Sequence, residues 1–499
     1  MIKNLKMTEF GDFQTPLKLA EQVARLVFER YSYVRSIVEP TCGLGNFIRA
    51  SVKANENLES VYGWEINSEY IKSAKNILCN HKRSKINIEQ KDFFSIDWSL
   101  LPEYLRHFVL FIGNPPWVTN SELGRIGSRN LPQKTNFQNH AGLEAVTGKS
   151  NFDISEWMLI KIAEYISGKK AAMSFLVKTS VARKVFLHIC KNRLSLKSID
   201  IHNIDAKKHF DVNVDACLFC TEGSSTSPKG YACSIYESLS DQRPVKTMGY
   251  ANGKLVSDID KYGLLKDIDS KSEMLWRSGI KHDCSKVMEF RLEGDRLING
   301  FEEEADLPGD YLYPMYKSSH IANDRLRHPV KYMLVTQRRL GIETDSIRIL
   351  SPKTWTYLQS YKDKLGSRKS SIYKNAPEFS VFGVGDYSFQ PWKIVISGLY
   401  KNIRFRLVGP FQEKPVVLDD TCYMMSFESE EKAEFVYRLL SSKVAGDFID
   451  SVVFKDSKRP VTVALLNRIS LKYLANHLGL ADKYNSFFEK SKQKQLNLF

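Results

Sequence analysis

The stretch SIVEPTCGLGNFIRA, residues 36–50, carries the clearest indication of this chain's fold. A short apolar run ends at Glu39, Gly43 and Gly45 follow within a turn, and a helical pattern begins at Phe47. Glycines here allow the backbone to approach a ligand closely, because they carry no Cβ. In an open α/β sheet this first strand-to-helix turn is where a nucleotide-like cofactor binds. A tight turn without a ligand is the alternative for a Gly-x-Gly taken alone.

Strand and helix patterns alternate on both sides of this turn. Apolar positions recur at helical spacing over residues 16–31, where Thr15 and Pro16 suggest a cap and first-turn pair. Strands that alternate with helices are typical of an open, mostly parallel sheet. The expected strands cover residues 36–38, 61–64, 86–88, 108–112, 171–177, 199–203 and 216–219, and further helices cover residues 47–54, 70–78 and 157–166.

The regular alternation fades after residues 221–229, a polar, linker-like stretch. The half that follows is rich in aromatic residues mixed with Lys and Arg. We therefore expect a domain boundary near residue 240. Residues 1–240 would form an α/β, Rossmann-like domain with a mostly parallel sheet, and residues 241–499 a mixed α+β domain.

Composition and charge narrow the class of protein. The chain has 499 residues, a net charge of +15, a pI of about 9.2 and a mean hydropathy of −0.32. A basic surplus favours a polyanionic partner such as nucleic acid, because Lys and Arg release counterions from phosphates. No apolar run reaches the roughly 20 residues that span a bilayer, and residues 1–9 lack the apolar core of a secretory signal. We therefore expect a cytoplasmic protein with no membrane partner.

Two short motifs suggest metal sites but favour simpler interpretations. Cys217 and Cys220 have C-x-x-C spacing, yet no second ligand pair follows, so two core thiols in a strand are favoured over zinc. Asp419 and Asp420 offer the paired acids of a metal-dependent nuclease. Their spacing from Lys414 makes no convincing site, and a structural turn is favoured. We expect no metal.

Acidic side chains follow the second and third expected strands. Glu65 ends the second strand, where an acid accepts hydrogen bonds from ribose hydroxyls in nucleotide-binding sheets. Asp92 follows the third strand and would accept from an adenine amine, while Phe93 would pack on the ring. A helix cap or a solvated loop residue is the alternative for each acid.

The strongest chemical motif is NPPW, residues 114–117, at the end of a very apolar strand. The two prolines fix the backbone and remove donors, which leaves the side-chain oxygen of Asn114 and the main-chain oxygen of Pro115 as acceptors beside the Trp117 ring. This arrangement suits a planar group bearing an NH₂. Accepting both N–H bonds helps a delocalised amine nitrogen become a nucleophile towards a sulfonium methyl group. A strand-ending Pro-Pro turn is the alternative.

The order of these motifs resembles the gamma class of DNA amino-methyltransferases, the N-6 DNA methylase family of Type II restriction-modification systems. In that family an N-terminal cofactor motif precedes the glycine loop, the two acids, the Asn-Pro-Pro-aromatic motif and a target-recognition domain. This chain has FQTP at residues 13–16 in first place, and the resemblance covers residues 10–222 motif by motif. Leu44 is a departure, at a position where the family accepts several residues.

The resemblance implies an adenine-N6 DNA methyltransferase that uses S-adenosylmethionine. Residues 1–240 would be its catalytic domain and residues 241–499 its DNA target-recognition domain. The target amine would be held by Asn114, Pro115, Pro116 and Trp117. The residues assigned to S-adenosylmethionine are Thr15, Glu39, Thr41, Gly43, Gly45, Glu65, Asp92 and Phe93.

A base inside a duplex cannot reach such a site, so the target nucleotide would be rotated out of the helix. The family places an aromatic residue where this chain has KHFD, residues 208–211, and Phe210 would then sandwich adenine against Trp117. An ordinary core or loop aromatic is the alternative for Phe210. We also expect the long polar segment of residues 119–150 to contact DNA phosphates near the flipped base.

The second half would read the DNA sequence. Its basic and polar clusters suit base edges or phosphates, and a solvated basic face is the alternative for any one residue. The candidates are residues 317–320, 336–339, 368–373 and 454–460, with Lys401, Arg404 and Arg406.

The predicted enzyme acts as a monomer on double-stranded DNA, and the resemblance implies a cognate restriction endonuclease that acts separately. RNA and protein-glutamine methyltransferases are alternatives that share the Asn-Pro-Pro-aromatic motif, but they are usually shorter and lack a large basic second half. The N4-cytosine DNA enzymes usually carry Ser in place of Asn114. A non-catalytic DNA-binding subunit that keeps the fold is a further alternative, but such a subunit would not need the intact motif of residues 114–117.

Overall fold

The computed structural model describes residues 14–79, 81, 83–98, 108–118, 153–329, 331–456 and 459–488. The chain folds into two compact units, which divide after residue 260 rather than near residue 240. The boundary lies later because the short strands β8, β9 and β10 of residues 232–256 join the first sheet, although they do not continue the strand–helix alternation. Phe13 and residues 119–150, which carried predictions, lie outside the described residues.

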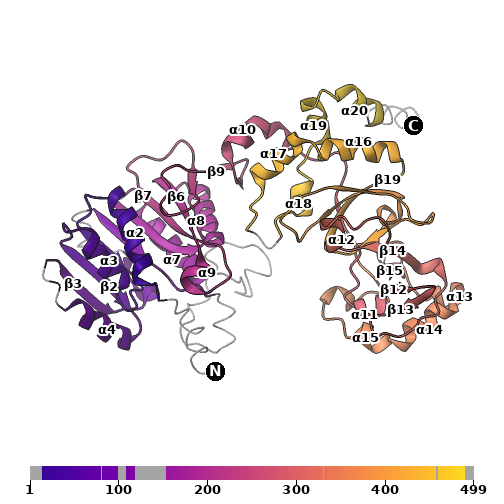
Figure 1. Ribbon diagram of the computed structural model, residues 1–499, viewed down its shortest axis with the longest axis horizontal. Coiled ribbons are helices and arrows are strands. Elements are labelled where there is room, and N and C mark those ends of the chain that lie inside the picture. The colour runs from indigo at the N-terminus through magenta and orange to yellow at the C-terminus, as the bar shows by residue number, and fades with distance from the viewer. Residues whose placement is uncertain are drawn as a thin grey trace. The chain divides into compact units, whose positions relative to one another are not determined.

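A ten-stranded sheet forms the centre of the first unit, in the order β10-β9-β8-β6-β7-β5-β4-β1-β2-β3 (Figure 1). The five strands from β3 to β5 in this order run parallel, and β7 runs antiparallel between β5 and β6. The expected α/β class with a mostly parallel sheet is confirmed. The strands are β1 (Ser36–Glu39), β2 (Ser60–Glu65), β3 (Lys85–Gln90), β4 (Val109–Gly113), β5 (Ala171–Lys178), β6 (Leu196–Ile204), β7 (Ala216–Gly223), β8 (Ala232–Tyr236), β9 (Lys246–Ala251) and β10 (Lys254–Val256).

Helices cover both faces of this sheet, because its central strands are apolar on both sides. β1 and β4 are buried along their whole length, as expected for parallel strands between two helical layers. Leu110 and Ile112 join the core formed with α2, α3 and α4, whereas Phe111 contacts Tyr165 of α7 on the other face, with ring centroids 5.8 Å apart. The helices are α2 (Leu17–Arg30), α3 (Asn46–Ala54), α4 (Ser68–Leu78), α7 (Ile154–Ile166), α8 (Thr179–Lys191) and α9 (Ala206–Phe210), with a 3₁₀ turn η1 at Phe93–Ser95.

The first helix differs from its prediction at its start. α2 begins at Leu17, Pro16 occupies the cap position, and no side chain caps the helix, so the expected cap at Thr15 is wrong. Thr15 is buried instead, and its main-chain oxygen accepts a hydrogen bond from the Asn46 side chain at 2.9 Å. This bond ties the chain before α2 to the first residue of α3.

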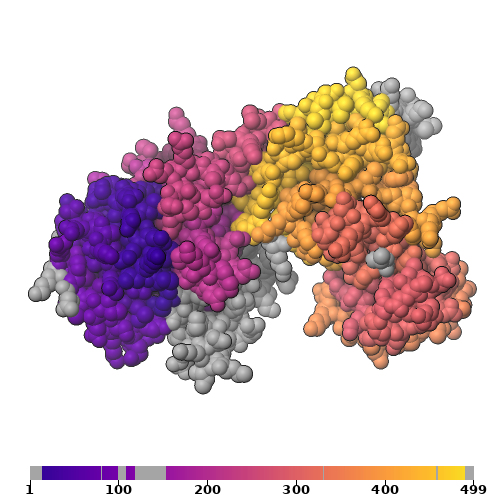
Figure 2. Space-filling view, in the orientation of Figure 1, coloured from indigo at the N-terminus to yellow at the C-terminus, as the bar shows by residue number. Residues whose placement is uncertain are grey.

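The second unit is a mixed α+β structure, as expected, with two separate sheets. Their orders are β11-β19-β16-β17 and β13-β12-β15-β14-β18. In Figures 1 and 2 the helices α16, α17, α19 and α20 gather at the end of this unit nearer to β19, away from the five-stranded sheet. The strands are β11 (Arg277–Ser278), β12 (Glu289–Glu293), β13 (Arg296–Ile298), β14 (Leu312–Tyr316), β15 (Lys331–Leu334), β16 (Trp392–Ser397), β17 (Arg406–Val408), β18 (Val417–Leu418) and β19 (Cys422–Phe427).

Short helices connect these strands, and longer ones follow β19. Among the described residues, every helix is too short or too polar to cross a membrane. The helices are α10 (Ile259–Leu265), α11 (Ser285–Met288), α12 (Ser318–Ala322), α13 (Ile347–Leu350), α14 (Pro352–Ser360), α15 (Lys362–Gly366), α16 (Glu430–Leu440), α17 (Lys443–Val452), α18 (Val463–Leu466), α19 (Leu471–His477) and α20 (Ala481–Phe488), with 3₁₀ turns at Lys266–Ile268, Gly309–Tyr311, Ser371–Tyr373 and Asp386–Phe389.

The C-x-x-C pair lies on β7, in the middle of the first sheet. Cys217 and Cys220 are both buried and free of disulfides, as the interpretation as core thiols predicts. Burial raises the pKa of the Cys220 thiol to about 11. A buried, protonated thiol is unreactive and packs as a small apolar side chain.

Candidate active site

The candidate site lies where the strand order of the first sheet reverses, between β1 and β4. β1 has β2 on one side and β4 on the other, so the loops that leave β1 and β4 run in opposite directions. In such sheets a crevice opens at this point, outside the carboxyl ends of the strands. The glycine loop, residues 40–45, leaves β1, and the NPPW motif, residues 114–117, leaves β4. Two motifs that are 70 residues apart in sequence are therefore neighbours in space.

Two close approaches join these motifs. The Thr41 hydroxyl lies 3.5 Å from the main-chain oxygen of Asn114. A Cβ at Gly113 would lie 3.3 Å from Cγ of Glu39, and the φ of Gly113 is +156°. The end of β4 thus has little room for a side chain, because the Glu39 carboxyl group already occupies the space in front of it.

The glycine loop is held open by hydrogen bonds to its main chain. Gly43 and Gly45 have positive φ angles of +49° and +79°, which glycine adopts without a Cβ clash. The N–H of Gly43 donates to Oε2 of Glu65 at 2.8 Å, and the N–H of Leu44 donates to Oε1 of Gln14 at 3.2 Å. A Cβ at Gly43 would approach that Gln14 oxygen to 2.6 Å. Gln14 is a positioning residue that the sequence analysis did not single out.

The acid that ends β2 has a structural role besides the predicted one. Oε1 of Glu65 accepts hydrogen bonds from the N–H groups of Ile66 and Asn67, both at 2.9 Å, while Oε2 accepts from Gly43. A carboxylate oxygen has two acceptor sites, so the N–H groups of Ile66 and Asn67 already occupy both sites of Oε1. The ribose contact stays a prediction.

The acid that ends β1 has a strongly perturbed pKa. Glu39 is 2% exposed, and its Oε2 has no hydrogen-bond donor within the described residues. Burial raises the pKa of this carboxyl group well above its usual range, partly offset by the N–H of Ile48, and Glu65 adds to the rise. Glu39 is therefore a buried acid at the carboxyl end of β1 whose Oε2 lacks a donor among the described residues.

Asp92 and Phe93 follow β3, beside the end of β2. The N–H of Lys91 donates to the main-chain oxygen of Glu65 at 3.1 Å, which fixes this adjacency. Oδ1 of Asp92 caps the 3₁₀ turn by accepting from the N–H of Phe94 at 3.0 Å, as the cap alternative predicts. Phe93 is buried and packs edge-on against Trp98, with ring centroids 5.2 Å apart. Their contacts with a cofactor stay predictions.

Hydrogen bonds to residues of β5 fix the NPPW motif at Trp117. The indole N–H of Trp117 donates to the main-chain oxygen of Leu176 at 3.2 Å, and the Lys178 ammonium donates to the main-chain oxygen of Trp117 at 2.9 Å. Lys178 also pairs with the buried carboxylate of Asp153 at 2.7 Å, and that carboxylate caps α7. Lys178 thus ties the motif to β5 and α7. The signal for it in the sequence was a lysine that ends an otherwise apolar strand.

The two predicted stacking residues are in contact with each other. The rings of Trp117 and Phe210 have centroids 5.1 Å apart at an interplanar angle of 62°, so they meet edge to face. A base between them needs parallel rings that are further apart. Trp117 is 4% exposed and fixed by its N–H, whereas Phe210 ends α9, a helix of five residues. Base stacking stays a prediction, and Phe210 is the ring that would have to move.

Several candidate DNA-reading residues of the second unit have structural partners instead. Gln337 is 3% exposed, and its Oε1 accepts from the N–H of Val381 while its amide donates to the main chain of Ile342. Arg368 donates to the main-chain oxygens of Leu365 and Ser380, both at 2.7 Å. Gln337 and Arg368 therefore hold loops of this unit together. The sequence analysis expected such residues either to contact DNA or to lie on a solvent-exposed basic face. Lys317 likewise pairs with buried Glu289 at 2.5 Å.

Asp419 and Asp420, the paired acids considered for a nuclease site, lie at a turn, as the sequence analysis favoured. Oδ1 of Asp419 accepts from the hydroxyl of Thr421 at 2.6 Å and from its N–H at 3.3 Å. Within the ranges that the structure describes, His, Cys, Asp and Glu side chains nowhere gather into a group able to hold a metal ion.

Comparison with known proteins decides the family. No protein-family model matches the chain. The chain is 46% identical over 478 residues to the Type II methyltransferase M.NspV of Nostoc sp., covering 95% of this chain and 99% of that protein. The chain belongs to the Type II methyltransferase family. A second Type II methyltransferase, M.VspI of Vibrio sp., is 32% identical over 110 residues, 21% of this chain and 25% of that protein.

A solved structure shares the fold of this Type II methyltransferase. It is that of the Type IIL restriction-modification enzyme MmeI in complex with DNA, with a TM-score of 0.53 and 15% identity. The match covers 93% of this chain, which spans 66% of the length of the MmeI chain. The expected family is confirmed, and with it an enzyme that transfers a methyl group from S-adenosylmethionine.

The residues of the crevice fit this cofactor. The buried Oε2 of Glu39 offers an acceptor that lacks a donor among the described residues, beside the end of β4 at Gly113. S-adenosylmethionine carries an ammonium group, a sulfonium and ribose hydroxyls, all of which suit carboxyl oxygens.

Replacing Glu39 by Gln is expected to stabilise the protein without cofactor, increasingly as the pH rises. The folded protein binds the Glu39 proton more tightly than the unfolded chain, where the pKa is about 4.3. Stability is therefore lost as the pH rises from that value towards the folded pKa, and Gln removes this loss. We expect a gain of about 1–3 kcal/mol at pH 8 and a smaller one at pH 5, measured by urea denaturation. A gain that does not grow with pH would contradict a raised pKa of Glu39 in the folded protein.

Replacing Lys178 by Met is expected to destabilise the first unit by about 3–5 kcal/mol, because the Asp153 carboxylate is left buried without its cation. The double variant Lys178→Met with Asp153→Asn keeps a capping side chain and removes the charge. It should be more stable than the single variant in urea denaturation. Equal stabilities would mean that the ion pair does not hold this part of the site.

Proposed function

We propose that the chain is a site-specific DNA methyltransferase that transfers the methyl group of S-adenosylmethionine to N6 of adenine in double-stranded DNA, after flipping the base out of the helix. We also propose that it is the modification enzyme of a restriction-modification system. The observation that carries this proposal is the position of residues 114–117 at the carboxyl end of β4. There the main-chain oxygen of Asn114 lies 3.5 Å from the Thr41 hydroxyl of the glycine loop. The names of M.NspV and of the MmeI–DNA complex support it.

Glu39, Glu65 and Asp92 would hold the cofactor, which supplies an electrophilic methyl group on a sulfonium. Each acid follows a different parallel strand, and parallel strands end at one edge of the sheet. Glu39 would accept from the ammonium group, Glu65 from the ribose hydroxyls and Asp92 from the adenine amine. Thr15, Thr41 and Phe93 would line the same crevice, and Gly43 and Gly45 would leave room for it.

Asn114 and Pro115 would act on the target amine. The Asn114 side-chain oxygen is buried, and Pro115 leaves its own carbonyl oxygen beside a backbone without N–H groups at residues 115 and 116. Accepting both N–H bonds of the amine favours a pyramidal nitrogen, whose lone pair then points away from the ring. The hydrogen bonds of Trp117 to Leu176 and Lys178 support this role, because a motif fixed before the reaction would need little reorganisation.

Replacing Asn114 by Ala should abolish methyl transfer and leave S-adenosylmethionine binding within about twofold, because the variant loses an acceptor for the amine and none of the cofactor acids. The measurement is transfer of tritiated methyl groups to mixed-sequence duplex DNA, followed by digestion and identification of the labelled nucleoside. Asn76→Ala, on the exposed face of α4, is the matched control and should keep full activity.

The label should appear in N6-methyl-2′-deoxyadenosine from DNA. Label in N4-methyl-2′-deoxycytidine would refute the adenine assignment, and label in RNA or protein but not in DNA would refute the substrate. An active Asn114→Ala variant would refute the role of the motif.

Replacing Phe210 by Ala should raise the KM for duplex DNA by roughly 5- to 150-fold, because one stacked base contributes about 1–3 kcal/mol. Phe210→Tyr keeps the aromatic face and should behave like the native enzyme. Equal losses in the Ala and Tyr variants would argue against stacking.

A further inference from the structure

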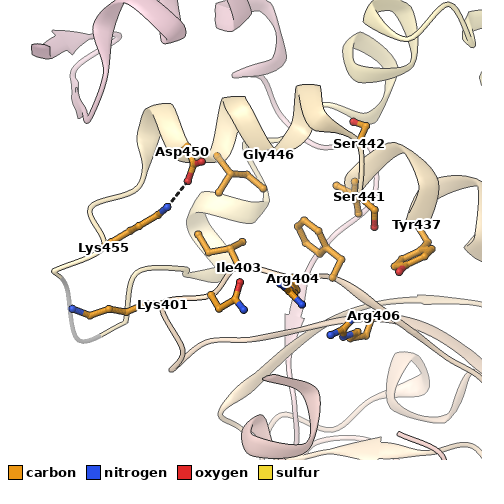
Figure 3. Close-up of a pocket in the computed structure, with 14 residues that line it drawn as sticks. Lys401, Ile403, Arg404, Arg406, Tyr437, Ser441, Ser442, Gly446, Asp450 and Lys455 are labelled. Atoms are coloured by element: carbon orange, nitrogen blue, oxygen red, sulfur yellow. Dashed lines mark ion pairs between the residues drawn. The ribbon is translucent and has the colours of Figure 1, made fainter. Parts of the chain in front are cut away.

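A pocket of about 400 Å³ lies in the second unit, between the segment that leads into β17 and the helices α16 and α17 (Figure 3). It brings together two basic segments that are far apart in sequence, residues 401–406 and the loop after α17. The charged and polar side chains that matter in it are Lys401, Arg404, Arg406, Tyr437, Asp450 and Lys455.

The lining of this pocket is strongly basic. Four of its side chains are cationic, and Asp450 is the single carboxylate among them. Asp450 is already matched by Lys455, with Nζ 2.9 Å from Oδ1. The lining residues therefore carry more positive than negative charge, and one of the cations, Arg406, also reaches Asp324 outside the pocket. Figure 3 shows Arg404 and Arg406 near Tyr437 on one side, and Lys401 and Lys455 on the other.

Arg406 has an unused donor at this pocket. Its side chain is 16% exposed, and its guanidinium reaches Asp324 at 3.4 Å. Its Nε is buried and donates to nothing within the described part of the chain. Buried donors nearly always find an acceptor, and a water molecule is enough to satisfy this one. Because Nε is inaccessible, the exposed part of the Arg406 side chain is what an anion in the pocket can contact.

Gly446 is part of the helical wall of the pocket. It lies inside α17, where glycine weakens a helix relative to alanine. A Cβ added there would meet no atom within 4 Å. The missing side chain thus leaves space in the pocket at a position where helix stability alone would favour another residue.

We propose that this pocket binds the phosphodiester backbone of duplex DNA without reading its sequence. The inference rests on the proposed function, which makes duplex DNA the substrate. Arginine and lysine that converge from two sides suit a strand that presents successive phosphates. Such contacts fix the position of the protein on the duplex, whereas base edges are read elsewhere.

The test measures binding of the full-length protein to two duplexes, one that it methylates and one of unrelated sequence, over a range of salt concentrations. The double variant Lys401→Gln with Arg404→Gln should lose roughly tenfold in affinity for both duplexes alike, and the slope of log K against log salt should become shallower by about 0.9 per lost contact. Arg438→Gln is the matched control, since Arg438 lies on the same unit, is 72% exposed and does not line the pocket.

A second variant fills the pocket and leaves every charge in place. Gly446→Leu should weaken both duplexes by a similar factor, while Gly446→Ala should bind as the native protein does. Thermal melting of each variant shows whether it is folded. Inorganic phosphate, added at constant ionic strength, should not compete, because a single small anion lacks the successive charges of the backbone.

Native affinity and slope in both Lys401→Gln/Arg404→Gln and Gly446→Leu would overturn the proposal, as would a loss confined to one duplex or selective competition by inorganic phosphate. If the native protein still methylates duplex DNA in that case, the pocket is misassigned and the proposed function stands. If the native protein neither binds nor methylates duplex DNA, both fail.

Discussion

The placement of β4 beside β1 is the constraint on which the site depends. Only this order brings Glu39, the glycine loop and Asn114 to one edge of the sheet, although β2 and β3 separate them along the chain. Gly113 shows how tightly the two strand ends meet, since even a Cβ there would lie against Glu39. The buried core of apolar side chains between β1, β4 and β5 and their covering helices maintains this register, and the polar groups of the crevice depend on it.

Polar residues at the strand ends then convert this packing into a rigid site. Glu65 holds the glycine loop through its main chain, and Lys178 holds Trp117 and Asp153 together. Glu39 differs from both, because burial without a full set of donors makes it costly to ionise. A buried group that lowers stability and faces a crevice is typical of residues kept for binding or catalysis.

Much of the first unit could be predicted because local patterns there agree with the fold. The apolar strand before Asn114 and the glycines after Glu39 indicate both an element and its place in the sheet. Contacts between distant segments leave no such pattern. Lys178, Gln14 and the later domain boundary became evident only in three dimensions. In the second unit the basic and polar candidates looked alike in sequence. Gln337 and Arg368 nevertheless hold loops together, whereas residues 401–406 and Lys455 meet in a pocket. Burial, which the sequence does not give, separates these roles.

The most direct test of the central claim is a crystal structure of the protein with S-adenosylhomocysteine, the product left after transfer. We expect the ligand in the crevice between β1 and β4, with its amino group at Glu39, its ribose at Glu65 and its sulfur facing Asn114. A ligand bound elsewhere, or bound with its sulfur turned away from the NPPW motif, would contradict the account.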